Sequence, residues 1–211
     1  MRELKSLFLI CLGVFRHQTR KKLVERIKRL FRPLGIIALL LVFWGSPHSE
    51  AQQPSEYQVK AAFLYNFANF IEWPKEALSD TTTLVIGVLG KDPFEAALTR
   101  FEKQKVKGRS LRIVQSERLQ DLPFCHMLFI NSTEEKNLTQ VFRYLEGKPT
   151  LTVGEVEQFA RRGGIINFVI RDKKVRFEIN RAKAIESGLK LSSKLLKLAM
   201  IVEGEKDKGE R

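Results

Sequence analysis

After residue 51 the sequence contains one cysteine and one histidine, and they are neighbours, Cys125 and His126. A catalytic pair would need the imidazole within hydrogen-bond distance of the thiol. Both belong to the apolar stretch "CHMLFIN", which is typical of a β-strand, and adjacent side chains of a strand point to opposite faces of the sheet. We therefore expect Cys125 to be a buried structural thiol and not a nucleophile.

The same shortage of residues excludes other chemistries from this part of the chain. A histidine-based triad would have to use His126, and a site with several histidine ligands for a metal cannot be built. No G-x-S-x-G nucleophile motif is present, and none of the acidic residues is singled out by its setting. We expect a protein that is not an enzyme, with no catalytic residue, metal or cofactor.

Two glycine-containing stretches could bind an anion. "GVLGKDPF" places Gly87 and Gly90 at the end of a predicted strand, where doubly wound folds bind ligands, but it lacks both the dinucleotide and the P-loop spacing. "ARRGGIINF" is either an anion-binding corner or the basic C-terminal turn of a helix stopped by glycine. We favour the structural interpretation for both.

A glycine stop accounts for Gly163 but leaves Gly164 unexplained, which suggests close approach of a partner or ligand. Residues 159–167 are therefore the predicted partner- or ligand-binding segment. The candidate residues are Phe159, Arg161, Arg162, Gly163, Gly164 and Asn167.

These candidates need an alternating α/β framework. Apolar runs predict strands at residues 83–90, 110–116, 126–131 and 150–153, and a β-hairpin at residues 165–180. Helical patterns lie at residues 93–104, 133–147, 155–162, 182–188 and 192–201, with Asp92 and Asn180 as caps. The predicted fold is a compact single α/β domain with a mostly parallel central sheet flanked by helices. It is Rossmann-like without a dinucleotide motif, with the C-terminal hairpin at one edge.

The stretch "VKAAFLYNFANFIEWP" predicts an amphipathic helix that enters this domain. Ser55 is its expected N-cap, and Pro74 ends the helical region. Lys60 falls within the apolar arc, and we expect its side chain to extend outward to solvent. The stretch is too short to cross a bilayer, which needs about 20 apolar residues.

The net charge of +13 suggests nucleic acid, but much of it lies in the first 51 residues, which carry ten Lys/Arg and three Asp/Glu. The remainder holds 27 basic and 21 acidic residues, a difference of +6. No basic block with interleaved aromatics follows, so we expect no nucleic-acid partner.

Residues 1–51 have the order of a signal peptide: a basic stretch, the apolar run "LGIIALLLVFWG", and small residues near Ala51. The alternative is an uncleaved anchor. A second apolar run at residues 7–15 makes the leader long and suggests a true start downstream, for example at Val24. We expect export to the periplasm, cleavage near Ala51, a linker at 52–55, a domain at 56–202, a charged disordered tail at 203–211, and no membrane span after cleavage.

Taken in order, several blocks resemble those of the YfiR family of periplasmic proteins. They are "EYQVKAAFLYNFANFIEWP", "IGVLGKDPF", "KGRSLRI", "CHMLFI", "LTVGEVEQFARRGGIINFVI", "VRFEIN" and "LKLSSKLLKLA". The resemblance covers about residues 56–202. It implies a non-enzymatic repressor that binds the periplasmic region of an inner-membrane diguanylate cyclase, or of a sensor kinase, and so controls cyclic di-GMP and biofilm formation. It also implies self-association, with a homodimer as the expected form.

The chain departs from this pattern in its cysteines. The best-known members hold intradomain disulfides, whereas this chain keeps only Cys125 after cleavage, so redox control by such a bond does not carry over. The alternative function is a periplasmic small-ligand-binding sensor module for another membrane signalling protein. Its ligand would lie at the carboxyl ends of the parallel strands.

Overall fold

The computed structural model describes residues 54–79 and 82–204. The predicted leader and the tail from residue 205 onward lie outside this range, as do residues 52 and 53 of the predicted linker. Within the described residues, no helix combines the length and apolar character needed to cross a membrane.

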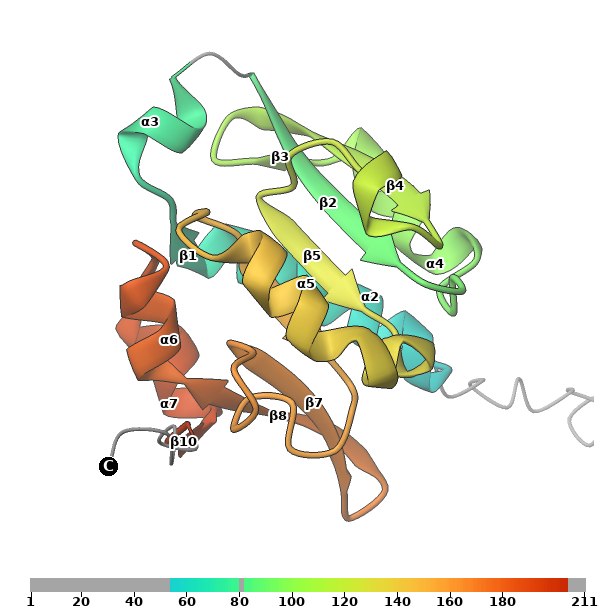
Figure 1. The fold of residues 1–211 in the computed structure, drawn as a ribbon. Coiled ribbons are helices and arrows are strands. Elements are labelled where there is room, and N and C mark those ends of the chain that lie inside the picture. The colour runs from blue at the N-terminus through green and yellow to red at the C-terminus, as the bar shows by residue number, and fades with distance from the viewer. Residues whose placement is uncertain (1–53, 80–81, 205–211) are drawn as a thin grey trace, which may run out of the picture. The chain divides into compact units, whose positions relative to one another are not determined.

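The core of the fold is a sheet with the strand order β10-β8-β7-β6-β5-β2-β4-β3 (Figure 1). Five of its seven pairings are parallel, and the antiparallel ones are β3 with β4 and β7 with β8. The predicted α/β class with a mostly parallel sheet is therefore confirmed. The strands are β2 Thr83–Leu89, β3 Lys105–Val106, β4 Arg109–Ser116, β5 Met127–Ile130, β6 Leu151–Gly154, β7 Ile166–Arg171, β8 Lys174–Asn180 and β10 Met200–Val202.

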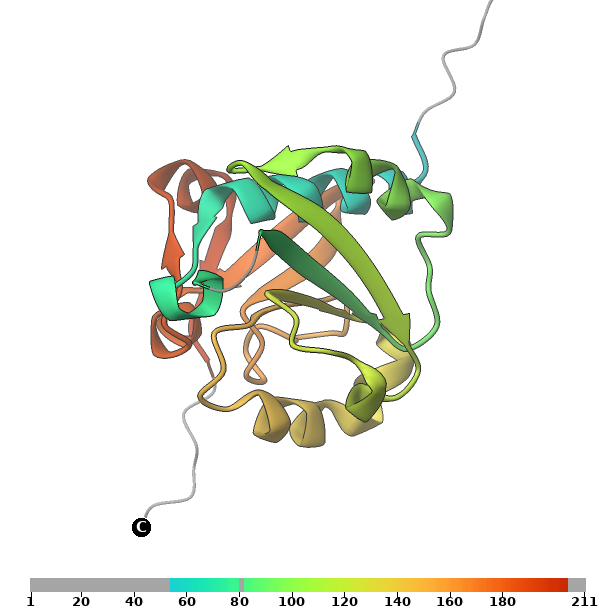
Figure 2. The same ribbon diagram turned by 90° about the horizontal axis from the view of Figure 1, so that it is seen from above.

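Helices α2 (Glu56–Phe70) and α5 (Leu138–Leu145) cover opposite faces of the sheet (Figure 2). Both faces of strand β5 are apolar, because each is covered by a helix. Met127 and Phe129 belong to the core on the α2 side, whereas Leu128 and Ile130 belong to the core on the α5 side. Such a strand is a continuous apolar run, as in "MLFI".

The entry helix begins as predicted and ends earlier. Ser55 caps it, since its Oγ accepts from the backbone N–H of Gln58 and the Gln58 side chain accepts from the N–H of Ser55. The helix ends at Phe70, ahead of the stop expected at Pro74, because β1 (Ile71–Glu72) pairs antiparallel with β9 (Lys190–Leu191).

Two predicted helices are shorter than expected. In the first, Asp92 accepts from the N–H of Phe94 in a turn and caps no helix, and Glu95 adopts φ +49. Only α4 (Ala96–Thr99) and the 3₁₀ turn η1 (Arg100–Lys103) follow. In the second, the 3₁₀ helix η3 (Ser132–Asn137) precedes α5. Short elements absent from the prediction are α3 (Lys75–Leu78) and η2 (Leu119–Asp121).

The C-terminal hairpin is confirmed, and Asp172 and Lys173 form its turn with positive φ at both. It does not form the edge of the sheet, because β10 pairs in parallel with β8 outside it. Asn180 caps α6 (Arg181–Glu186) as predicted. The last predicted helix stops at α7 (Ser193–Leu198), since the residues from Met200 onward form β10.

Candidate functional site

The predicted binding segment is a loop between β6 and β7, and the helix expected at residues 155–162 is absent. Gln158 adopts φ +57, a left-handed conformation that stops right-handed helix propagation. The loop is closed by its own backbone: the N–H of Arg162 donates to the carbonyl of Gln158, and the N–H of Gly164 donates to that of Phe159.

Phe159 explains this loop conformation and also explains Gly164. The ring is fully buried and packs on the backbone of Gly154 and Gly164 and against Phe142. A Cβ at Gly164 would lie 2.1 Å from Phe159 Cε1. The close approach expected at Gly164 is thus an internal one, and neither Phe159 nor Gly164 is exposed to a partner.

The exposed members of the segment are the two arginines. Arg162 forms an ion pair with Glu135, with 3.1 Å between Nη1 and Oε1, while Arg161 lines a groove. Gly163 has φ +114, a conformation that favours glycine, and lies beside Phe142. The six predicted residues therefore do not form one surface. Phe159, Gly164 and Asn167 are buried, Gly163 is half-buried, and Arg161 and Arg162 are exposed.

Asn167 lines the same groove as Arg161, a cavity of about 550 Å³ at the carboxyl end of β6. In register, Asn167 of β7 lies beside Gly154 of β6 and opposite Glu178 of β8. Strand β7 continues past the end of β6, so the hairpin forms one wall of the groove. The N-terminal turns of α2 and the beginning of the β6–β7 loop also line it.

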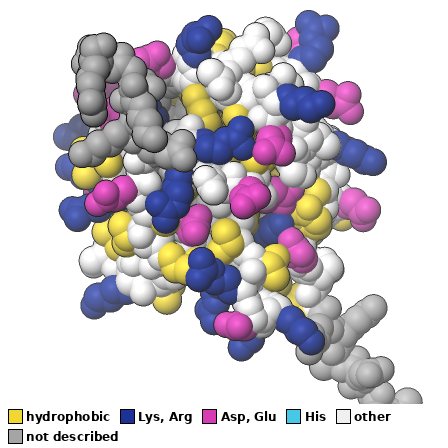
Figure 3. All heavy atoms as spheres, turned by 60° about the horizontal axis from the view of Figure 1, so that its bottom comes forward, with side chains coloured by type: hydrophobic (Ala, Val, Ile, Leu, Met, Phe, Trp, Pro, Cys, Tyr) yellow, Lys and Arg dark blue, Asp and Glu magenta, His cyan; other side chains and the backbone are white. Residues whose placement is uncertain are grey.

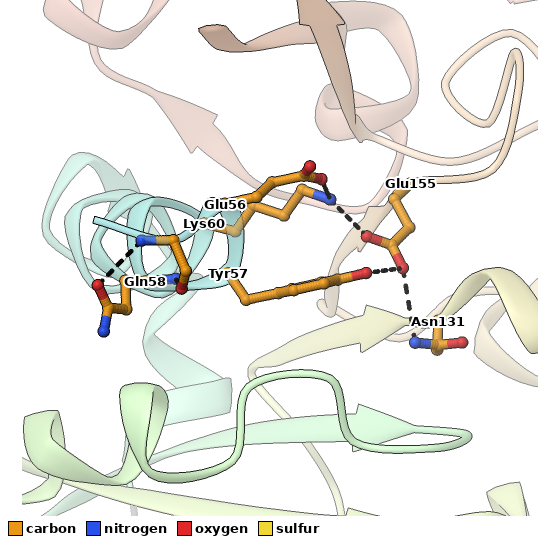
Figure 4. A network of polar contacts seen from close by, with 7 residues as sticks. Glu56, Tyr57, Gln58, Lys60, Asn131 and Glu155 are labelled. Atoms are coloured by element: carbon orange, nitrogen blue, oxygen red, sulfur yellow. Dashed lines mark hydrogen bonds and ion pairs between the residues drawn. The ribbon is translucent and has the colours of Figure 1, made fainter. Parts of the chain in front are cut away.

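A buried ion pair lies at this groove, and Figure 4 shows its members converging on Glu155. Lys60 Nζ lies 2.6 Å from Glu155 Oε2 and 2.5 Å from Glu56 Oε1. The Tyr57 hydroxyl and the Asn131 amide both reach Glu155 Oε1, at 3.3 and 3.5 Å. Three separate elements are thereby joined: α2, the end of β5 and the end of β6.

The expectation that Lys60 extends to solvent is wrong, since the residue is only 4% exposed. Burial lowers the pKa of Lys60, but its hydrogen bonds to Glu155 and Glu56 outweigh burial, so the net pKa is raised and the ammonium stays charged. Burial and the charge of Glu155 raise the pKa of Tyr57. A lysine inside an apolar helical arc was the sequence signal for this cluster, but nothing local pointed to Glu155.

The other chemical candidates have structural roles. Cys125 is buried, and burial raises its pKa to about 11, so the thiol stays protonated at neutral pH and is a poor nucleophile. Its sulfur occupies the space beside Gly87, where a Cβ would lie 2.6 Å from Sγ. Gly90 has φ +92 and forms the turn after β2.

His126 is held as a neutral ring. Its Nδ1 accepts from the N–H of Val85 at 3.1 Å, which assigns the proton to Nε2, and Nε2 donates to the carbonyl of Ala77 at 3.0 Å. Among the described residues, no group of three or more His, Cys, Asp or Glu side chains is placed to hold a metal ion. The arrangement at the groove is suited to binding by hydrogen bonds and charge.

A comparison with protein-family models identifies the family of this chain. The model described as YfiR/HmsC-like matches residues 57–200. This range holds α2 and the groove lining except for Glu56, and the eight-stranded sheet up to the first residue of β10. The resemblance noted in the sequence is confirmed, and the chain belongs to the YfiR/HmsC-like family.

Proposed function

We propose that this chain is a periplasmic repressor that binds the periplasmic region of an inner-membrane diguanylate cyclase and holds the enzyme inactive. The observation that carries the proposal is membership of the YfiR/HmsC-like family over nearly all of the described domain. What supports the step from family to function is that the best-known members are non-catalytic periplasmic regulators of diguanylate cyclases, as the sequence resemblance implies. Before it reaches its partner, the chain is exported and its leader is cleaved near Ala51.

The mechanism is thermodynamic linkage. A protein that binds the inactive state of its partner more tightly than the active state shifts the equilibrium by that difference in affinity. Moving a partner from 99% active to 99% inactive requires about 10⁴-fold preference for the inactive state. No bond is made or broken, which agrees with a domain whose cysteine and histidine are both buried.

The partner surface that we propose is the exposed part of the β6–β7 loop, centred on Arg161 and Arg162. Both arginines lie outside the hydrophobic core, and Arg162 has an ion-pair partner, Glu135, that a partner carboxylate could replace. Gly164 is excluded as a contact because its neighbour is the ring of Phe159. A sensor kinase in place of the cyclase, and a homodimer, are compatible with the same surface.

A pull-down from membranes with the tagged protein, combined with cyclic di-GMP measurement in a deletion strain, tests the proposal. The wild-type gene should lower cyclic di-GMP and biofilm in that strain, and the protein should capture a membrane cyclase. The double variant Arg161→Glu, Arg162→Glu should lose both effects and keep its melting temperature, since both side chains are at the surface.

Arg118→Glu is the matched control. Arg118 is also an exposed arginine in an ion pair, with Asp121 at 3.3 Å, and it lies at the start of η2 rather than beside the groove. It should repress like wild type. Unchanged cyclic di-GMP on deletion would refute repression of a cyclase, and equal loss in both variants would refute the assigned surface.

A second candidate function, a small-ligand-binding sensor module, is favoured by the groove itself. The groove lies at the carboxyl end of β6, the edge where open α/β sheets bind ligands. The two functions are compatible, because a ligand could alter the affinity for the partner.

A further inference from the structure

The groove is acidic although the domain around it is basic. Residues 52–211 carry a charge of +6, and the basic and acidic side chains on the face in Figure 3 are interspersed. Among the described residues, the charged side chains that line the groove are four carboxylates and two cations, a difference of −2, and the one other titratable group is the neutral hydroxyl of Tyr57. The charged residues are Glu56, Glu155, Glu157, Glu178, Lys60 and Arg161. The charge of Lys60 is matched within the protein by Glu155, so the excess falls on the remaining wall.

One buried acceptor in this groove has no hydrogen-bond partner among the described residues, and it is Asn167 Oδ1. Asn167 is only 1% exposed. Its Nδ2 donates to Glu178 Oε2 at 3.2 Å, which assigns the orientation of the amide, because a flipped amide would place two oxygens together. An unpaired buried acceptor is costly, so a ligand that offers it a donor gains more than an ordinary hydrogen bond.

We propose that this groove binds an organic cation with N–H donors, a primary ammonium or a guanidinium group. One N–H donates to Asn167 Oδ1, and the charge lies against Glu178, whose carboxylate already accepts from the neighbouring amide. Such charge-assisted bonds are about twice as strong as neutral ones. The group can come from a free amine or from a lysine or arginine side chain of a polypeptide.

The charge of Arg161 affects the binding of a cation and of an anion in opposite directions. Its guanidinium has no ion-pair or hydrogen-bond partner among the described side chains, and it lines the same groove. An arginine there repels a bound cation and would attract a bound anion. Removing its charge therefore strengthens cation binding and weakens anion binding.

Calorimetric titration of the purified protein with putrescine tests the proposal. The matched control ligand is the bis-quaternary analogue of putrescine, in which each nitrogen carries three methyl groups. It has the same two charges and no N–H donor. We expect putrescine to bind and its methylated analogue to bind at least about tenfold more weakly. In parallel, the peptide acetyl-Gly-Arg-Gly-amide is compared with acetyl-Gly-Gln-Gly-amide.

The variants test the assigned residues. Asn167→Leu should weaken binding about tenfold or more, and the melting temperature of the unliganded protein should stay level or rise because an unsatisfied buried acceptor is removed. Glu178→Gln should also weaken binding, and it serves if the first variant fails to fold. Arg161→Gln should tighten binding, roughly fivefold. Glu135→Gln, outside the groove, should leave the affinity unchanged.

Binding of putrescine identifies a free amine as the source, and binding of the arginine peptide alone identifies a polypeptide side chain. Binding of neither, equal binding of the methylated analogue, or weaker binding by Arg161→Gln would overturn the proposal. The titrations need no membrane partner. Their failure would therefore leave cyclase repression standing, and failure of repression would leave them interpretable.

Discussion

The ammonium of Lys60 lies between two carboxylates of very different exposure. The side chain of Glu155 is 8% exposed and that of Glu56 is 46% exposed. The ion pair with the exposed Glu56 contributes little to stability because water and ions screen it. The buried carboxylate of Glu155 needs the charge of Lys60 to offset its loss of hydration. The two halves of one cluster thus differ in their expected contribution to stability.

Replacing Lys60 by methionine should lower the free energy of unfolding by about 3–5 kcal/mol, because Glu155 would be left as an uncompensated buried charge. Glu56→Gln should cost no more than about 1 kcal/mol. Urea unfolding of both variants measures the difference. The double variant Lys60→Met, Glu155→Gln should regain part of the loss, and equal costs for the two single variants would contradict this account.

His126 predicts an acid-side loss of stability. Burial lowers its pKa in the folded protein, and the charge of Arg109 adds to this, whereas in the unfolded chain the pKa is about 6.5. Below that value the unfolded state binds a proton that the folded state does not, so stability is present above pH 6.5 and falls as the pH drops below it. One such group gives a slope of at most about 1.4 kcal/mol per pH unit.

Urea unfolding between pH 7.5 and 5.5 measures this dependence. His126→Gln should be less stable at pH 7.5, because the bonds to Val85 and Ala77 are disturbed, and should show a flatter pH profile. A variant with the wild-type slope would mean that other groups cause the dependence.

At the scale of elements, the β6–β7 loop is shaped by one ring between two glycines. Gly154 ends β6, Gly164 precedes β7, and Phe159 fills the space that their side chains would need. The loop is consequently ordered by the core on the α5 side of the sheet. This packing holds Arg161 at the groove and the neighbouring Arg162 beside Glu135.

Gly164→Ala should lower the free energy of unfolding by about 1–3 kcal/mol through overpacking against Phe159. The cost should shrink when Phe159 is also replaced by leucine, because the two residues interact directly. Gly147→Ala is the control: its φ is +70 and nothing lies within 4 Å of the added Cβ, so its cost should not depend on Phe159. Chemical denaturation of the wild type, the two single variants and the double variant measures this interaction. If the costs of Gly164→Ala and Phe159→Leu simply add in the double variant, the steric explanation is refuted.

For the whole molecule, the distribution of charge matters more than its sum. Residues 52–211 are basic as a whole, yet the groove has more carboxylates than cations. A regulator with this distribution can present arginines to a partner on the loop and accept a cation in the groove beside them. The neighbouring position of the two surfaces provides a physical route by which ligand binding could change partner affinity.

Sequence patterns alone were sufficient for strands β2, β4, β5 and β6, the C-terminal hairpin, the Ser55 and Asn180 caps, and the family. These features depend on periodicity and on side chains within a few residues of one another. The burial of Cys125 also followed from its place in an apolar stretch, but the expectation that Cys125 and His126 belong to a strand is wrong, since both precede β5.

Only the tertiary structure decided the rest, because it depends on contacts between distant residues. Glu155 lies 95 residues from Lys60 in the sequence, so no local pattern could pair them. The helix expected at residues 155–162 was lost to the packing of Phe159 against two glycines, and β1 and β10 exist only through strands that pair with them. The groove follows from β7 extending past the end of β6, a matter of register that a sequence does not display. The lack of a hydrogen-bond partner for Asn167 Oδ1 among the described residues likewise depends on the packing around it.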